Sequence, residues 1–242
     1  MNIGLAVRRF GRVGGMESVA FSFAHWLVHA GHTVDVWTSE VCGPVDGLKI
    51  REMNSRGRGV LWKAKSLRGA LRRIPVNRYE GFLNFERGGL GGTYRAGAGC
   101  HASWVRQRGA RIGDRWLTAL DCESMVHADR VVVNSHMVLT EVMDLYGLPK
   151  SRLHLVRNVV DTERFKPATK TEVPSIVFPG GQVPRKGLRV AVEATSQLPN
   201  VELIVLGAVS SGIQRWARSI HERVRFVGHV SDPERILSAA HA

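Results

Sequence analysis

The chain has 242 residues, of which 44% are hydrophobic and 23% charged, the balance of an ordinary folded protein with a substantial core. No run of about 18 apolar residues occurs, which argues against a membrane-spanning helix, and Cys42, Cys100 and Cys122 are too widely spaced for a zinc site or a disulfide framework. The 34 Lys and Arg residues against 21 Asp and Glu give a formal charge of +13, which predicts an anionic partner: nucleic acid, an anionic membrane surface or a phosphorylated substrate.

The first forty residues predict a β-α-β unit. Asn2–Val7 is a short apolar strand, apolar residues recur at helical spacing from Glu17 onward, and residues 33–37 return to a strand pattern. The intervening loop contains Gly14 and Gly15, and such a loop lies at the carboxyl end of the first strand, where open α/β sheets bind ligands. Glycine lets backbone N–H groups approach an anion closely, although a simple tight turn explains this pair equally well.

The next stretch is strongly basic. Residues 51–73 carry eight Lys or Arg and one acidic residue, with Leu and Trp recurring near helical spacing. Residues 60–74 are therefore predicted to form a cationic amphipathic helix on an anionic membrane surface, and segment 104–116 is a second candidate. The residues expected to contact the membrane or an acceptor are Trp62, Lys63, Lys65, Arg68, Arg72, Arg73, Trp104, Arg106 and Arg108. Nucleic-acid binding is the alternative use of this charge, but no recognised binding motif accompanies it.

Further strands follow. Residues 81–85 and 131–133 have strand patterns and are separated by a glycine-rich stretch, and residues 153–157 form another candidate strand. Ser135 is the predicted N-cap of a helix that continues through Leu145.

A polar stretch divides the chain. Residues 161–174 contain two prolines and have the composition of a linker, so we predict domains at 1–167 and 168–242. After it the β-α alternation restarts, with strands predicted near residues 175–178, 201–206 and 223–227 and a last helix near Asp232.

The second domain has a glycine loop of its own. Gly180 and Gly181 precede Arg185 and Lys186, and two cations at a strand-to-helix junction suit a diphosphate that gains charge as it leaves. Neither glycine loop has the spacing of a dinucleotide-binding or P-loop motif, which argues against those two classes of enzyme. Because the chain ends after a helix with no following strand, we expect either a truncated sheet or a partner that covers its edge.

Several segments resemble retaining GT-B glycosyltransferases of family 4. They are GGMESVAFSFAHWLVHAGHTVDVWTS, VVVNSHMVLTEVMDLYGLPKSRLHLVRNVVDTERFKP and FPGGQVPRKGLRVAVEATSQLPNVELIVLG. The stretch GGTYRAGAGCHASWVRQRG is most similar to the lipopolysaccharide-core glucosyltransferase branch.

The resemblance implies an α/β fold of two facing Rossmann-like domains, the second incomplete. It also implies hexose transfer, with retention, from a UDP- or ADP-linked sugar to a glycan or glycolipid. The nucleotide sugar would be a co-substrate, with no cofactor and no metal. With three separate cysteines and no secretory signal, a cytoplasmic enzyme is expected, peripheral on the inner face of the membrane.

The resemblance also implies roles for single residues. Gly14 and Gly15 would lie beside the donor diphosphate and the acceptor, and Gly180 and Gly181 would form the donor loop. Arg185 and Lys186 would neutralise the diphosphate. His101 would face the transferred sugar as the catalytic residue, and Asn158 and Asp161 would form the hinge. The sequence departs from the family in two places. Ala98 stands where some relatives have Asp, and the chain ends before the Glu-x7-Glu motif that holds the donor sugar. The alternative is therefore an inactive remnant that binds an acceptor or an anionic membrane surface without transferring sugar.

Overall fold

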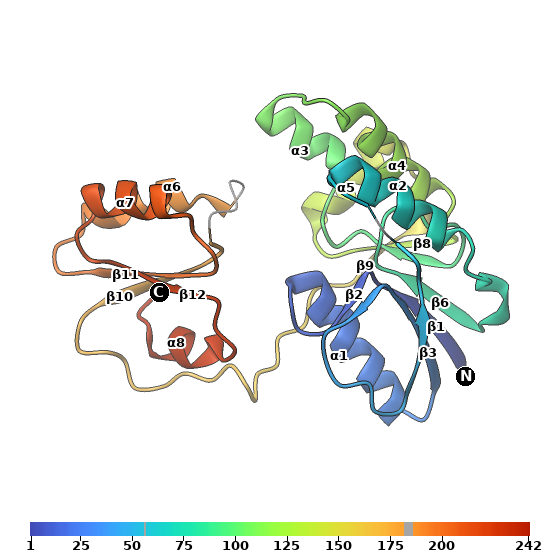
Figure 1. Ribbon diagram of the computed structural model, residues 1–242, viewed down its shortest axis with the longest axis horizontal. Coiled ribbons are helices and arrows are strands. Elements are labelled where there is room, and N and C mark those ends of the chain that lie inside the picture. The colour runs from blue at the N-terminus through green and yellow to red at the C-terminus, as the bar shows by residue number, and fades with distance from the viewer. Residues whose placement is uncertain (56, 182–185) are drawn as a thin grey trace. The chain divides into compact units, whose positions relative to one another are not determined.

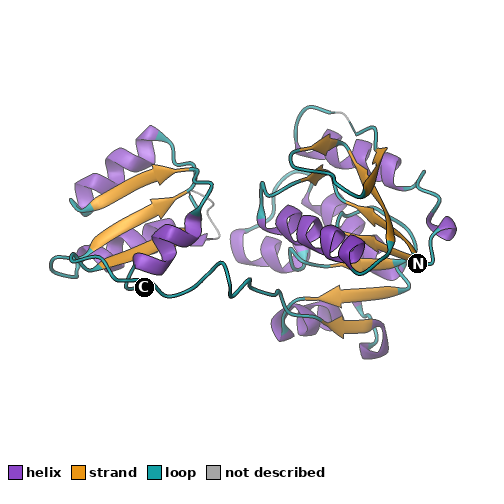
Figure 2. Cartoon of the chain, turned by 90° about the horizontal axis from the view of Figure 1, so that it is seen from below, coloured by secondary structure: helices purple, strands orange, loops and turns teal. Residues whose placement is uncertain are grey.

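The computed structural model describes residues 1–55, 57–181 and 186–242, and it divides into two compact units, residues 1–158 and 159–242 (Figure 1). The sequence placed this boundary after residue 167, within a segment between Asn158 and Ser175 that forms no helix or strand. In each unit, helices flank a parallel sheet (Figure 2). This α/β organisation was expected from the alternation of strand and helix patterns.

Unit 1, residues 1–158, has a parallel sheet that comprises, in the described residues, seven strands in the order β5-β3-β1-β6-β7-β8-β9. These strands are β1 (Asn2–Ala6), β3 (Thr33–Thr38), β5 (Leu48–Glu52), β6 (Gly81–Asn84), β7 (Thr93–Arg95), β8 (Arg130–Val133) and β9 (Leu153–Leu155). The short strands β2 (Arg9–Phe10) and β4 (Glu40–Val41) pair with each other. The helices are α1 (Gly15–His29), α2 (Val60–Leu71), α3 (His101–Arg108), α4 (Asp114–Val126) and α5 (His136–Tyr146), with 3-10 turns η1 (Val76–Arg78) and η2 (Lys150–Arg152).

Both faces of this sheet are covered, because successive residues of a strand point to opposite faces. Leu5 and Val7 pack in the cluster that contains α1, whereas Ala6 packs in the cluster that contains α2. A strand that is buried on both sides needs a continuous apolar run, and this is the pattern of the first strand in the sequence.

The buried side of α2 corrects one expectation. Leu67, Ala70 and Leu71 form its apolar face, and all three are buried in the core of unit 1. The prediction that this helix lays its leucine face on a membrane is therefore wrong, because its own sheet already covers that face.

Unit 2, residues 159–242, has a smaller parallel sheet in the order β10-β11-β12. Its elements are β10 (Ser175–Pro179), α6 (Leu188–Ser196), β11 (Glu202–Leu206), α7 (Ser211–Ile220), β12 (Val224–Gly228) and α8 (Pro233–Ala239). Leu203 and Val205 pack with α6 and α7, whereas Ile204 and Leu206 pack with α8. The last residues lie along the outer edge of β10, since the backbone N–H of Val177 donates to the carbonyl of Ala242 at 2.7 Å.

A buried carboxylate on α4 joins several elements of unit 1. Asp121 has no exposed surface, and its Oδ1 accepts a hydrogen bond from Nε of Arg87 at 2.6 Å. Its Oδ2 accepts from the backbone N–H of His101 and from the hydroxyl of Tyr146, both at 2.8 Å. The loop after β6, the first residue of α3 and the last residue of α5 are thereby held by one charged group.

We predict that Asp121→Asn lowers the free energy of unfolding by about 3 kcal/mol, because it leaves the Arg87 guanidinium partly buried without an anion. Urea denaturation of both proteins measures the difference. The control is Asp144→Asn on the exposed side of α5, which should change stability by no more than about 0.5 kcal/mol. Equal stabilities for the two variants would contradict the role given to Asp121.

Candidate functional site

The glycine loop of unit 1 begins α1 at the carboxyl end of β1. Gly14 is the N-cap with an extended backbone (φ −166°), and neither Gly14 nor Gly15 adopts a left-handed conformation. A Cβ on Gly15 would meet no atom within 4 Å. The space beside Gly15 is therefore open, and a left-handed backbone does not explain either glycine.

Acidic groups lie close to this loop. A Cβ on Gly14 would stand 2.5 Å from Oε2 of Glu17. Glu86 follows β6, and its Oε1 accepts the backbone N–H of Arg8 at 2.9 Å. Burial raises the pKa of Glu86 above its ordinary value, and the nearby charge of Glu17 raises it further. Sequence reasoning missed Glu86, because its place beside the loop depends on the pairing of β1 with β6.

His101 is the first residue of α3 and is buried. Its Nε2 lies 3.0 Å from Oδ1 of Asp114. Asp114 also accepts hydrogen bonds from Nη2 of Arg108 and from the backbone N–H of Arg111, both at 2.6 Å. The Arg108 hydrogen bond is the main reason why the pKa of Asp114 lies well below its usual range. These contacts give His101 a structural role, and its catalytic role stays a prediction.

The neighbouring thiol is not activated. Burial raises the pKa of Cys100 to about 12, so the group is a neutral thiol at physiological pH. A nucleophilic role for Cys100 would need the thiolate, so the structure gives no support for one.

The two predicted hinge residues both make local hydrogen bonds. Asn158 ends unit 1, and its Oδ1 accepts from Nη2 of Arg95, the last residue of β7, at 2.5 Å. Asp161 lies near the start of unit 2, where its Oδ1 accepts the backbone N–H groups of Glu163 and Arg164 at 3.1 and 3.0 Å. Sequence analysis did not single out Arg95.

Glycines also line the carboxyl edge of the sheet in unit 2. Gly181, Gly207 and Gly228 follow β10 and β11 and end β12, with φ values of +53°, +101° and +77°. The backbone N–H of Gly181 donates to the carbonyl of Leu206 at 2.8 Å, and that of Gly207 donates to the carbonyl of Gly228 at 2.6 Å. A Cβ on Gly181 would stand 2.7 Å from the carbonyl oxygen of Ala208. The left-handed backbone favours glycine at all three positions, and at Gly181 and Gly207 close packing against neighbouring backbone also excludes a side chain.

One of the two predicted donor-site cations lies beside this edge. Lys186 is exposed just before α6, and its Cβ would be 3.1 Å from a Cβ on Gly180. Arg185 lies outside the described residues, so its role stays a prediction. In the described parts of the chain, no three His, Cys, Asp or Glu side chains gather as potential metal ligands.

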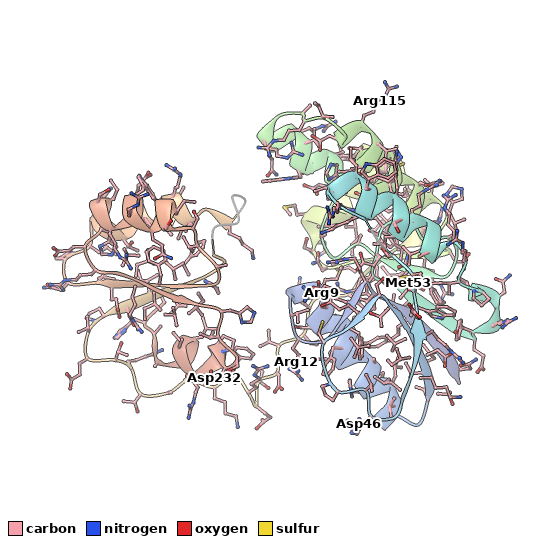
Figure 3. All side chains as sticks on the ribbon, in the orientation of Figure 1. Arg9, Arg12, Asp46, Met53, Arg115 and Asp232 are labelled. Atoms are coloured by element: carbon pink, nitrogen blue, oxygen red, sulfur yellow. The ribbon has the colours of Figure 1, made fainter. Side chains whose placement is uncertain are left out.

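The basic surface of unit 1 is built from the first turns of α2 and α4. Trp62 is 68% exposed, and its ring centre is 5.2 Å from the ammonium group of Lys65, which also lies 6.0 Å from the ring centre of Trp116. Ile112 is fully exposed, and Figure 3 shows Arg115 extending away from the ribbon at the start of α4. Apolar and cationic groups are therefore exposed together here.

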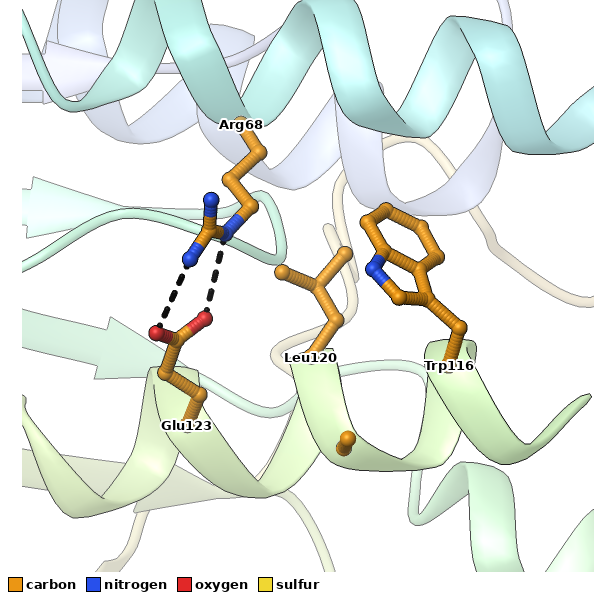
Figure 4. A pocket seen from close by; sticks show the side chains of 5 residues that line it. Arg68, Trp116, Leu120 and Glu123 are labelled. Carbon is orange, nitrogen blue, oxygen red and sulfur yellow. Dashed lines mark hydrogen bonds and ion pairs between the residues drawn. The ribbon is translucent and has the colours of Figure 1, made fainter.

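Three of the predicted contact residues are ion-paired instead. Nε and Nη2 of Arg68 donate to the two carboxylate oxygens of Glu123 at 3.2 and 3.1 Å, beside a pocket of about 350 Å³ that Trp116 and Leu120 also line (Figure 4). Arg72 donates to the same carboxylate. With Arg108 paired to Asp114, these arginines are not the free surface cations that the sequence predicted. Of the remaining predicted residues, Lys63, Lys65, Arg73 and Arg106 are exposed with Trp62, and Trp104 is half-buried.

In the described residues, no helix meets the length and hydropathy that crossing a bilayer requires.

Comparison with known proteins gives one family match. The family model described as Glycosyltransferase Family 4 matches residues 13–164. Among curated proteins, one component of the phosphatidylinositol N-acetylglucosaminyltransferase of Arabidopsis thaliana is 29% identical over 118 residues, a match that covers 44% of this chain and 26% of that protein. The chain thus spans about a quarter of the length of this curated relative.

Solved structures share the fold. WaaG, a glycosyltransferase involved in lipopolysaccharide biosynthesis, is similar with a TM-score of 0.82 and 15% identity, over 98% of this chain and 73% of that one. Sucrose-phosphate synthase from Thermosynechococcus elongatus gives a TM-score of 0.75 at 15% identity, over 99% and 73%. Alr3699/HepE from Anabaena, solved in complex with UDP and glucose, gives 0.67 at 15% identity, over 99% and 72%. The expected GT-B fold is confirmed.

Proposed function

Because the chain belongs to glycosyltransferase family 4, we propose that it transfers a hexose, with retention, from a UDP- or ADP-linked sugar to a glycan or glycolipid acceptor. The observation that carries this proposal is the glycine-lined carboxyl edge of the unit 2 sheet, with the exposed Lys186 beside it. The WaaG and HepE structures support an envelope glycolipid such as lipopolysaccharide as acceptor and UDP as donor nucleotide.

The donor side must stabilise a leaving group. Transfer breaks the bond between the anomeric carbon and a diphosphate oxygen. The acceptor hydroxyl oxygen forms the new bond to that carbon, and its proton passes to the departing diphosphate. Negative charge grows on the departing diphosphate, and fixed donors stabilise it most when they are already in place. Lys186 supplies a positive charge at the start of α6, and we assign the same role to Arg185. Glycines at this edge let a diphosphate approach the backbone closely.

The acceptor side has different chemistry. Glu17 and Glu86 place carboxylates beside Gly14 and Gly15, and carboxylates accept hydrogen bonds from sugar hydroxyls but repel phosphate. We therefore assign this loop to the sugar hydroxyls of the acceptor and of the transferred hexose, in place of the donor diphosphate that the sequence predicted for it. We assign His101 to the transferred sugar, with Asp114 fixing its ring orientation.

Nucleotide binding tests the donor assignment. We predict that UDP, UDP-glucose or ADP-glucose binds the full chain in calorimetric titrations and that Lys186→Ala weakens binding about tenfold, because one charge-assisted hydrogen bond is lost. Arg185→Ala/Lys186→Ala should abolish it. The control is Lys150→Ala, an exposed lysine of unit 1, which should bind as the wild type does. No binding of any nucleotide to a folded chain would contradict the proposal.

We also propose that the exposed patch of Val60, Trp62, Lys63, Lys65 and Ile112 rests on an anionic membrane surface, where a glycolipid acceptor would be found. The patch combines the two features that bind interfaces, since apolar side chains enter the headgroup layer and cations attract anionic lipid. No whole helix face is required, because the α2 residues of the patch lie in the first two turns of that helix and Ile112 lies just before α4.

Vesicle flotation tests this surface. We predict that the chain floats with vesicles of phosphatidylglycerol but not of phosphatidylcholine, and that Trp62→Ala reduces the bound fraction at least about threefold. Trp26→Ala is the matched control, because Trp26 is 61% exposed on α1 and lies outside the patch. The patch would be excluded as a membrane contact if Trp62→Ala and Trp26→Ala reduced the vesicle-bound fraction equally, or if the chain showed no preference for anionic lipid.

A further inference from the structure

Arg95 is a buried arginine with no carboxylate partner in the part of the chain that the structure describes. It ends β7 and is 8% exposed. Its Nη2 donates to Oδ1 of Asn158, and its guanidinium carbon lies 5.8 Å from the ring centre of Phe85. Within the described residues, no Asp or Glu oxygen lies within 4.0 Å of its nitrogens.

This arrangement differs from that of two other arginines of unit 1. Arg87 is paired with Asp121 and Arg108 with Asp114. A guanidinium has five N–H donors and does not lose its charge in proteins, so burying it without an anion is costly. Burial accordingly lowers the pKa of Arg95, and no nearby charge offsets the effect. An anion bound by Arg95 best explains why a charged residue is buried here despite the free-energy cost.

The loop after β7 leaves room for this guanidinium. A Cβ on Gly97 would stand 2.2 Å from Nη1 of Arg95, so any other residue would displace the side chain. Gly97 does not have a left-handed backbone, and its conformation therefore does not require glycine. Nδ2 of Asn134 donates to the carbonyl of Gly97 at 3.2 Å and holds the loop in place.

We propose that Arg95, with the side-chain amide of Asn158, binds a phosphate group of a substrate at the carboxyl end of β7. The planar guanidinium presents paired N–H donors that match two phosphate oxygens, and the Asn158 amide can add a donor of its own. The proposal rests on the proposed function for the identity of the substrate. The phosphate belongs either to a phosphorylated sugar acceptor or to the nucleotide donor.

Binding of simple phosphates to the full chain tests this site. The probes are inorganic phosphate, glucose 6-phosphate and UDP, each titrated by calorimetry at constant ionic strength. We expect Arg95→Gln to weaken binding of inorganic phosphate at least about tenfold, since the charged hydrogen bonds are lost. Arg130→Gln removes the same charge from an exposed arginine at the opposite end of the sheet and should bind as the wild type does.

Thermal unfolding without phosphate shows whether the Arg95→Gln chain is folded. Arg95→Gln should melt at or above the wild-type temperature, because an unpaired buried charge is removed. If that variant does not fold, Arg95→Lys keeps the charge without the planar fork, and it should bind phosphate more weakly than the wild type while melting cooperatively.

The three probes identify the source of the phosphate. If Arg95→Gln weakens the binding of glucose 6-phosphate but not of UDP, the site belongs to the acceptor. If it weakens the binding of UDP but not of glucose 6-phosphate, the site belongs to the donor. A wild type that binds no phosphate, or a folded Arg95→Gln chain that binds all three probes unchanged, overturns the proposal. Nucleotide binding that still depends on Lys186 would then leave the proposed transfer function intact.

Discussion

Asp121 is a carboxylate with no exposed surface, and the carboxyl end of the unit 1 sheet depends on it. Its partners Arg87, His101 and Tyr146 come from the loop after β6, the start of α3 and the end of α5. Burying a charge costs least when it is paired and hydrogen-bonded. This pairing fixes the three segments together, and it places the start of α3 where the chain leaves β7.

The two sheets expose different chemistry at their carboxyl ends. In unit 1 the glycine loop lies beside Glu17 and Glu86, and the cation Arg95 is set apart at the end of β7. In unit 2 the edge is formed by glycine backbone and an exposed lysine. Hydroxyl groups suit the first edge and a diphosphate suits the second, and this division supports a transferase that holds acceptor and donor on separate units.

Much of the fold follows from local sequence pattern. The strands at residues 2–6, 81–84 and 131–133 are short apolar runs, and the predicted N-cap of α5 is confirmed because Oγ of Ser135 accepts the backbone N–H of Val138. The strand β5 was missed, since LKIRE is an edge strand with three charged residues, and only Leu48 and Ile50, both half-buried, pack against the core. The prediction of one amphipathic helix over residues 104–116 is wrong, because α3 ends at Arg108 and α4 begins at Asp114.

The site was predicted less completely, because its features depend on partners that are distant in sequence. In the sequence Arg68 resembles a free surface cation, but in the structure Glu123 of α4 lies within hydrogen-bonding distance of it. The opposite holds for Arg95, because only the fold shows that it is buried and that no carboxylate of the described residues lies within 4.0 Å of it. Glycine loops were easier to recognise, because their residue type alone signals a close approach of backbone.

The central claim is that the glycine-lined edge of unit 2 binds the nucleotide sugar, and the most direct test is a backbone amide NMR titration of the full chain with UDP-glucose. The account predicts chemical-shift changes centred on Gly181, Lys186 and Gly207. Changes confined to residues 1–158, or an unchanged spectrum of a folded chain at saturating ligand, would contradict it.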